Sequence, residues 1–245
     1  MKPHLKWAVY FLCFAVAVCC EAADSAPKTL SCDGLQTSPV TDFGKRVEIV
    51  AQGFSVLPPQ GEGWCYRAIS SAGGSFFKLP KFEKGFESFP SRDQIAALHI
   101  FSAIALSLAG LTDFGTNIKS SEELESVVNR LITEHLFSQI LDGVQSAEHR
   151  FRLLEANIVS DTFLGARCVR FNATVEERGH LQAPGLVFLL NLTANMVCVH
   201  PTAPDSELIW IGFGERYVQG DQPAADVLKR EYEPFVQSLR FMPPR

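Results

Sequence analysis

The sequence predicts an α+β domain in which an antiparallel sheet is flanked by helices. The stretch 162–217 reads as four consecutive strands, because its runs of Val, Phe, Ile and Leu stop at turn-forming residues in 176–185, 193–195 and 201–205. Connections this short favour an antiparallel meander. A second observation is the helical repeat of apolar residues that follows Ser120. One face of that helix must pack on the sheet.

Length and composition are those of a single folded domain. The chain has 245 residues, of which 47% are apolar and 20% are charged, and no linker or internal repeat divides it. We expect a signal peptide over 1–22, a flexible arm over 23–44 and one domain over 45–245. The formal charge of −5 becomes −6 when Lys2, Lys6 and Glu21 leave with the signal peptide. This acidic balance argues against nucleic acid as a partner.

The N-terminus has the layout of a secretory signal peptide. Two lysines precede an uncharged apolar stretch over 7–20, and small and polar residues follow. A helix over 7–20 would rise only about 21 Å, short of the roughly 30 Å hydrocarbon core of a bilayer. Two routes of processing stay open: cleavage after Ala22, or lipidation of Cys19 or Cys20 at a degenerate lipobox. The expected location is the periplasm or cell envelope, with or without a lipid anchor.

Four of the seven cysteines lie beyond the signal peptide, at Cys32, Cys65, Cys168 and Cys198. An even number in an exported protein predicts two disulfides, with three possible connectivities. Proximity in sequence favours Cys32 with Cys65 and Cys168 with Cys198. If a strand over 186–192 lay between the latter two, their Cα atoms would be about 9.6 Å apart, beyond the roughly 7 Å limit. That pairing therefore requires another strand order or a bent edge.

The first half of the domain is expected to be mostly strands. The stretch 45–69 alternates enough for two strands around a turn at 58–61, and 75–79 suggests a third. The apolar stretch 95–109 fits a strand buried on both faces, with a helix as the alternative.

One helix is expected before the meander along the chain, and another after it. Ser120 with Glu123 forms a capping box, and the helix that it starts should end at Gly143. After the meander, Pro223 should open a helix through Tyr232, which Pro234 then interrupts. The side chains expected to dock on the core beyond it are Phe235, Leu239 and Phe241.

The order of these elements resembles a known fold. A "GFSVLPPQGEGW" hairpin, a strand with "FFKLP", one long amphipathic helix, a meander and a C-terminal "EPFVQSLRF" resemble the PsbP-like fold over 46–241. The motifs "CVHP" and "GERY" are similar to those of uncharacterised bacterial exported proteins and lipoproteins. The resemblance implies an α/β/α sandwich and an accessory or binding role. It implies no catalytic residues.

The pair Cys198 and His200 is the strongest candidate for catalysis. Two residues apart on a strand, they share a face and could form a thiol–imidazole pair or half of a metal site. In an oxidising compartment, however, Cys198 should be oxidised, and His200, before Pro201, should lie at the surface. No other His has a spacing that would complete a metal site, and phosphate-binding and GxSxG motifs are absent.

A second candidate is a polar cluster at one end of the sheet. Glu215 and Arg216 follow an apolar strand and could meet Arg167 and Arg170 there. Such a cluster could bind an anionic ligand. The alternative is a set of solvated charges that contribute little to the stability of the fold.

A third candidate is the phenylalanine-rich stretch 76–89. Its Phe82 and Phe86 stand among Lys78, Lys81 and Lys84, in a segment broken by proline and glycine. Exposed aromatic rings beside lysines suit a membrane surface or an envelope partner. The alternative is that the rings cover the edge of the core.

These observations predict an exported envelope protein that acts as a non-enzymatic binding or assembly module. We expect neither a cofactor nor a metal. The alternative is a thiol-dependent enzyme or hydrolase centred on Cys198 and His200. The sequence leaves open the small-molecule ligand, the partner, the physiological process and the oligomeric state.

Overall fold

The structure is a computed structural model. It describes residues 29, 31–33, 37–68, 80–86, 99–107, 118–133, 150–180, 183–204 and 208–243. The strands are β1 (Ser38–Pro39), β2 (Val47–Ile49), β3 (Phe54–Val56), β4 (Cys65–Ala68), β5 (Pro80–Phe86), β6 (His99–Ser107), β7 (Phe151–Phe163), β8 (Ala166–His180), β9 (Ala183–Val199), β10 (Leu208–Val218) and β11 (Arg240–Phe241). The helices are α1 (Ser121–Arg130) and α2 (Lys229–Gln237), with a 3₁₀ turn at Val50–Gln52.

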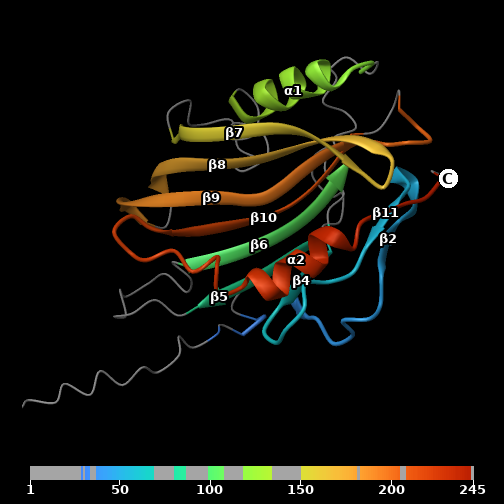
Figure 1. Cartoon of the computed structure of the whole chain (residues 1–245). Coiled ribbons are helices and arrows are strands. Elements are labelled where there is room, and N and C mark those ends of the chain that lie inside the picture. The colour runs from blue at the N-terminus through green and yellow to red at the C-terminus, as the bar shows by residue number, and fades with distance from the viewer. Residues whose placement is uncertain are drawn as a thin grey trace, which may run out of the picture.

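The fold is α+β and dominated by its sheet. Among the described residues, eight strands pair in the order β1-β4-β5-β6-β10-β9-β8-β7, and their pairings are antiparallel. A smaller sheet has the order β11-β3-β2 (Figure 1). Within the described ranges, no helix has the length and hydropathy to cross a membrane.

Each face of the large sheet borders its own hydrophobic core. On one face, Leu124 and Val128 of α1 are buried in a cluster with Phe171 of β8. On the other face, Phe235 of α2 is buried in a cluster with Phe213 of β10 and with the inner side of the small sheet. The strands that pass through both cores alternate their side chains between them.

The predicted turn at 193–195 is wrong, because β9 runs through it without a break. Pairing of β9 shifts register there with both neighbours, which marks a β-bulge. Ala194 has a positive φ of 52°, and its N–H donates to Oδ1 of Asn172 at 3.2 Å. Turn-forming residues at this point therefore bend one strand instead of separating two.

Both predicted disulfides are formed. With β9 unbroken, β8 and β9 are neighbours, and Cys168 pairs in register with Cys198 at a Cα–Cα distance of 4.0 Å. The intervening strand that seemed to forbid this pair does not exist. Cys32 bonds to Cys65 of β4, near β1, which pairs with the same strand. Two disulfides indicate an oxidising compartment.

The hairpin predicted around 58–61 is also wrong. The stretch crosses from one sheet to the other, because β3 pairs with β2 and β11 while β4 pairs with β1 and β5. The tight turn lies earlier, at Gly53, whose φ of 70° suits glycine. The strand predicted over 75–79 lies outside the described residues, and β5 begins directly after it.

The strand expected within 95–109 is confirmed by β6, and the capping box of α1 is confirmed as well. The Ser120 hydroxyl accepts from the Glu123 N–H at 3.1 Å. Residues 134–149, which include the predicted helix end, lie outside the described residues. The last helix starts later than expected and continues through Pro234. Consecutive turns occupy 225–228.

Docking of the C-terminal segment on the core is confirmed. Phe235 and Leu239 are fully buried, and Phe241 packs against the same cluster.

Candidate functional site

A cavity of about 180 Å³ opens on the sheet face that carries α1. Side chains from β5, β6, β8, β9 and β10 surround it, together with residues at the start of β7. Five lining residues are charged: Lys81, Glu83, Arg150, Glu177 and Arg216. The uncharged lining residues are Ser102, Phe151 and Leu190.

Strand alternation explains why β10 contributes only Arg216 to the cavity lining. Trp210 and Arg216 share one face of the sheet, and the two positions between them on that face are Gly212 and Gly214. The side chains of Asn195 and Leu192 occupy the space beside these two glycines.

Glu177 is a buried carboxylate in the cavity lining. Its side chain is only 2% exposed and pairs with Arg150, whose Nε donates to Oε1 at 3.0 Å. The Nη1 atom of Arg216 lies 4.0 Å from Oε2 of Glu177 and 3.1 Å from Nε2 of His180. Two guanidinium groups therefore converge on one buried carboxylate.

The cavity lining carries a second ion pair. Nζ of Lys81 lies 2.7 Å from Oε1 of Glu83, and the two side chains are 31% and 7% exposed. Among the described residues, the lining therefore includes both cations and carboxylates.

Burial changes the pKa of Arg216. Loss of solvent lowers the pKa of its guanidinium, while Glu177 acts in the opposite direction. The group also lies over the ring of Phe188, with 5.0 Å between Cζ and the ring centroid. Its position is thus held by a carboxylate, an imidazole and an aromatic face.

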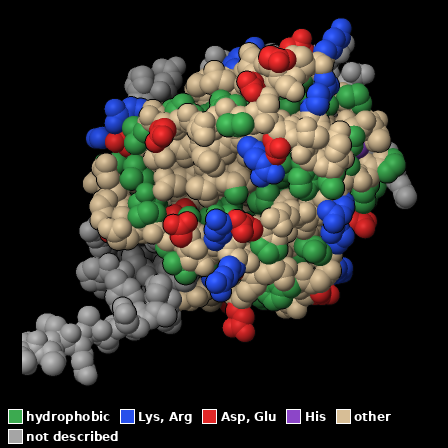
Figure 2. Space-filling view, in the orientation of Figure 1, with side chains coloured by type: hydrophobic (Ala, Val, Ile, Leu, Met, Phe, Trp, Pro, Cys, Tyr) green, Lys and Arg blue, Asp and Glu red, His purple; other side chains and the backbone are tan. Residues whose placement is uncertain are grey.

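The surface outside the cavity has a mixed distribution of charge. On the face shown in Figure 2, acidic and basic side chains are interspersed over the surface. That face carries no broad area of one sign.

The structure does not form the polar cluster predicted from Arg167, Arg170, Glu215 and Arg216. Arg216 lines the cavity, but Glu215 points to the opposite face, where it is buried. There its carboxylate accepts from the N–H groups of Ala224 and Ala225, the latter at 3.1 Å. Adjacent residues on a strand face opposite sides, which separates Glu215 from Arg216.

Arg170 lies far from Arg216 along the sheet. Arg216 pairs in register with Leu190, which pairs with Val175 of β8. Arg170 is five residues before Val175 on the same strand, a separation of about 17 Å. Its own partner is the carboxylate of Asp161.

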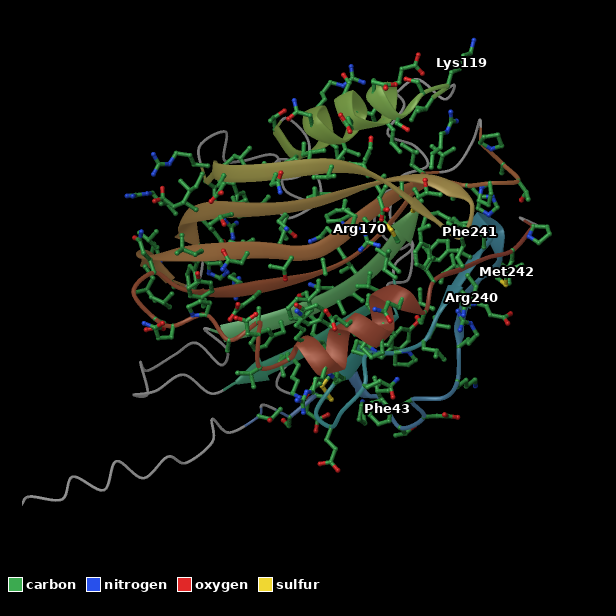
Figure 3. The ribbon with its side chains drawn as sticks, viewed as in Figure 1. Phe43, Lys119, Arg170, Arg240, Phe241 and Met242 are labelled. Carbon is green, nitrogen blue, oxygen red and sulfur yellow. A yellow bond between two sulfur atoms is a disulfide. The ribbon has the colours of Figure 1, made fainter. Side chains whose placement is uncertain are left out.

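Arg167 is also engaged elsewhere, near the start of α1. Its guanidinium donates to the backbone carbonyls of Ile118 and Lys119. Figure 3 shows Lys119 at that end of the helix and Arg170 on the sheet.

The structure corrects the prediction that Phe82 belongs to an exposed interaction loop. This ring is 1% exposed and contacts Tyr66 and Phe235, with centroids 5.3 Å and 5.7 Å away. It lies in β5, which pairs with strands on both sides and so has no free edge for docking. Lys78 and the side chain of Phe86 lie outside the described residues. Of the three lysines, Lys81 lines the cavity.

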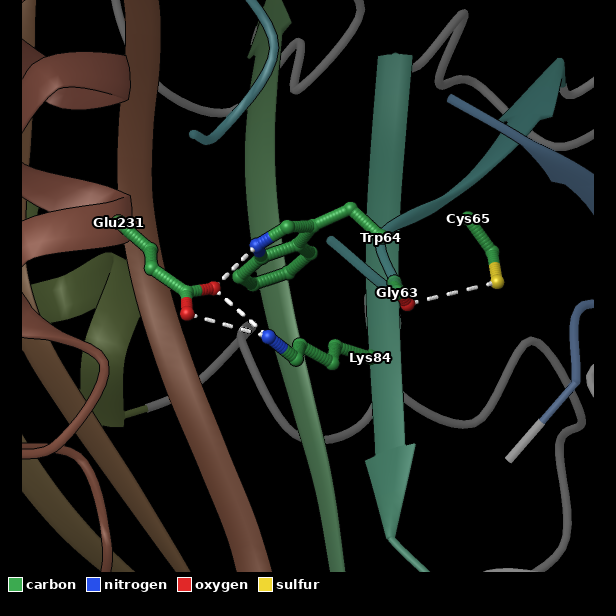
Figure 4. Close-up of polar contacts among 5 residues, drawn as sticks. All are labelled: Gly63, Trp64, Cys65, Lys84 and Glu231. Carbon is green, nitrogen blue, oxygen red and sulfur yellow. Dashed lines mark hydrogen bonds and ion pairs between the residues drawn. The ribbon is translucent and has the colours of Figure 1, made fainter. Parts of the chain in front are cut away.

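Lys84 is buried instead of exposed, and it pairs with α2. Its Nζ lies 2.8 Å from Oε2 of Glu231, which also accepts from the indole N–H of Trp64 at 2.7 Å (Figure 4). A lysine at a core-facing position obscured the alternation of β5 in the sequence. The glutamate that neutralises it is distant along the chain.

Cys198 and His200, the candidate catalytic pair, both make structural interactions. Cys198 is bonded to Cys168 and carries no thiol in this state. His200 was expected at the surface, but it is fully buried, with Nε2 2.8 Å from the carbonyl oxygen of Gly53 and 3.0 Å from that of Met242. The N–H of Thr202 donates to Nδ1 at 3.2 Å. These partners assign the ring hydrogen to Nε2.

Sequence reasoning missed most of the cavity. Glu177 fell in a predicted turn, whereas β8 continues to His180. Arg150 follows residues that gave no strand signal, and Glu83 was read only as part of a lysine-bearing loop. The alternation of Lys81 and Glu83 with Phe82 was the signal that could have placed them on one face.

Comparisons with known proteins find similarity to solved structures. No family model matches the chain, and no curated protein matches it. The solution structure of cyanobacterial PsbP (CyanoP) from Synechocystis sp. PCC 6803 is similar at 16% sequence identity and a TM-score of 0.36, covering 80% of this chain and 91% of that chain. At this TM-score, the similarity carries no argument about the site or the function.

Proposed function

We propose that this chain is an exported, non-enzymatic binding module of PsbP-like α/β/α type, whose ligand occupies the charged cavity on the sheet. The observation that carries the proposal is the convergence of Arg150 and Arg216 on buried Glu177 beside unfilled space. Ligand sites are concave, with a few polar groups fixed among apolar ones.

A purely structural role for these charges would not need the space. Protein interiors are close-packed, and buried ion pairs are often no more stabilising than apolar residues of the same volume. Here the ion pairs border a cavity of about 180 Å³ that also presents a hydroxyl and two apolar side chains. This combination supports recognition of a small molecule.

Support for export comes from the two disulfides and from the signal-peptide pattern at 1–22. Either processing route, cleavage or lipidation, would place the domain in the periplasm or at the envelope. A binding role there is compatible with assembly on an envelope protein or a membrane surface.

Support for a binding role over catalysis comes from the cysteine–histidine pair. A disulfide leaves Cys198 without the thiolate that nucleophilic catalysis requires. Both ring nitrogens of His200 are occupied by the backbone.

The experiment is a thermal-shift screen of a chemically diverse metabolite library, followed by calorimetric titration of each hit. Hits should bind the wild type and fail to bind Ser102→Leu, in which the larger side chain fills the cavity. Thr162→Leu is the matched control, because Thr162 is an exposed strand residue that does not line the cavity. Equal binding to Ser102→Leu, or no hit in the library, would contradict the proposal.

A further inference from the structure

The geometry points to an uncharged polyol, about the size of a monosaccharide, as the ligand of the cavity, hydrogen-bonded to Glu177 and Lys81. This inference rests on the proposed function and specifies its ligand. Three properties of the cavity lead to it: the pairing of its charges, the spacing of its polar atoms and its volume.

The charged side chains of the lining are paired with one another. Lys81 lies against Glu83, and both Arg150 and Arg216 lie against Glu177. Both carboxylates also oppose the lowering of the Arg216 pKa by burial. Every charged residue that the structure describes in the lining thus has an opposite charge beside it. A ligand with a net charge would lose its hydration there without a matching gain, whereas an uncharged ligand avoids this cost.

The spacing of the polar atoms around Glu177 favours a hydroxyl group. Its Oε1 accepts from Nε of Arg150 at 3.0 Å, whereas its Oε2 lies 4.0 Å from Nη1 of Arg216, too far for a hydrogen bond. An oxygen about 2.8 Å from both atoms fits this gap. A hydroxyl can donate to the carboxylate and accept from the guanidinium, whereas an ionised carboxylate only accepts and an ammonium only donates.

The rest of the lining suits further hydroxyl groups on a carbon ring. The Lys81 ammonium has three N–H donors, and its side chain is 31% exposed beside Glu83. Ser102 supplies a hydroxyl that can donate or accept. Leu190 and Phe151 supply apolar surface for the C–H groups of the ring.

The volume of the cavity sets the size of the polyol. The space of about 180 Å³ equals that of roughly six molecules of liquid water. A hydroxymethylene unit is about as large as one such water molecule, so about five or six of them fill the cavity. Hexoses and cyclitols have this composition.

The experiment compares neutral and charged rings of nearly equal size by calorimetry and by ligand-observed NMR. The neutral probes are glucose, galactose and myo-inositol, which also distinguish a sugar from a cyclitol. The charged probes are glucuronate, galacturonate, glucosamine and galactosamine, at about pH 6, where the amino sugars are protonated. At least one neutral probe should bind, and every charged probe should bind at least about tenfold more weakly than the tightest neutral one.

Two variants test the charge pairing in opposite directions. Glu177→Gln removes a charged acceptor, so it should weaken the tightest neutral probe at least about fivefold and improve the uronates relative to it. Lys81→Met removes a charged donor, so it should also weaken that probe and improve the amino sugars relative to it. If Glu177→Gln does not fold, Lys81→Met carries the test, because Lys81 is the more exposed residue.

Glu176→Gln is the matched control. Glu176 precedes Glu177 on the same strand and pairs with Arg152 and Arg178, but it does not line the cavity. Its replacement should leave the binding of the neutral probes unchanged.

The outcomes separate this inference from the proposed function. A charged probe that binds as tightly as the best neutral one, no binding of any neutral probe, or undiminished binding by Glu177→Gln and Lys81→Met would overturn the inference. The proposed function would survive any of these results if another library compound still bound the wild type and not Ser102→Leu. Loss of all ligands would end both.

Discussion

At the scale of single residues, Asn195 sets the shape of the longest strand. It is almost fully buried, and its Oδ1 accepts from the indole N–H of Trp210 at 2.9 Å. Its Nδ2 donates to the carbonyls of Thr193 and Phe213, at 2.9 Å and 3.1 Å. One amide therefore fixes the bulge of β9 to the neighbouring strand. The space that it needs is left by Gly212.

The first prediction follows from that space. In Gly212→Ala the new Cβ would lie 1.8 Å from Oδ1 of Asn195, so the side chain or the strand must shift. We expect the free energy of unfolding to fall by about 1 to 3 kcal/mol, as for other overpacked sites. Urea denaturation measures it.

Gly214→Ala is the control, because its Cβ would lie 3.0 Å from the end of the flexible Leu192 side chain and at an ordinary contact distance of 3.7 Å from the Asn191 carbonyl oxygen. Equal stability of Gly212→Ala and the wild type would mean that the bulge is not locked as described.

A second prediction concerns Glu176 and pH. Hydrogen bonds from Arg178 and Arg152 lower the pKa of this carboxyl from 4.5 to about 2. A depressed folded-state pKa contributes stability that is complete above about pH 4.5 and is lost as the pH falls toward 2. The wild type should therefore lose more stability than Glu176→Gln over this interval, measured by urea denaturation at its two ends. Parallel pH profiles for the two proteins would contradict the pairing.

Some of these structural roles could be predicted from the sequence, and others could not. Ser120 and Glu123 were predictable, because a capping box is local. Asn195 was read as a turn former, since its partners Trp210 and Phe213 come from another strand. A short polar side chain gives the same local signal in a turn and in a bulge.

At the scale of elements, α2 is held to the sheet by a polar clamp as well as by packing. Glu231 accepts from Trp64 and Lys84, and its backbone carbonyl accepts from the N–H of Gln60. The clamp joins the helix to β5 and to the loop before β4. A Cβ at Gly61 would lie 2.7 Å from the Glu231 carboxylate, so this loop needs glycine there.

The third prediction removes this clamp. Glu231→Ala leaves the buried ammonium of Lys84 and the indole N–H of Trp64 without their acceptor. We expect a loss of about 1.5 to 3 kcal/mol in unfolding free energy, the range for hydrogen bonds to charged groups. Urea denaturation followed by tryptophan fluorescence measures this loss.

Glu233→Ala is the matched control, because Glu233 is 45% exposed and its Lys229 contact is 3.6 Å long. It should lose less than about 0.5 kcal/mol. If Glu231→Ala and Glu233→Ala lose the same unfolding free energy, the contacts of Glu231 stabilise the fold no more than an exposed ion pair does.

Helices and strands were predicted correctly where the signal is local in the sequence. They were predicted wrongly where pairing between distant strands determines the fold. The repeat of α1 identified this helix directly, and the apolar run of β6 favoured a strand over a helix. In contrast, β3 and β4 looked like a hairpin, but hydrogen bonds to β11 and β1 place them in different sheets. Long-range pairing has no counterpart in a local pattern.

At the scale of the whole molecule, two disulfides join distant parts of the chain. They span 33 and 30 residues, and loops of this length correspond to about 3 to 4 kcal/mol each in the chain-entropy model. The fourth prediction is that reduction lowers the melting temperature markedly, and that Cys168→Ala/Cys198→Ala and Cys32→Ala/Cys65→Ala each account for part of it. Unchanged melting in reductant would contradict the disulfides.

The fold class and the cysteine pairs could be predicted because they depend on composition and order along the chain. The cavity could not, because Lys81, Arg150, Glu177 and Arg216 come from four separate segments. Strand order brings them together, and that order was misread at the bulge of β9. One inserted residue in a strand changes which face every later side chain takes.

The most direct test of the central claim observes the arginine side chains while ligand is added. The Nε–H NMR signals of isotope-labelled arginine, assigned with Arg→Lys variants, are recorded during titration with a compound that binds in the metabolite screen. Saturable shifts are expected at Arg216 and Arg150 and none at Arg170, which lies outside the cavity. Signals that all stay fixed, or an Arg170 signal that moves as far as that of Arg216, would contradict a ligand site in the cavity.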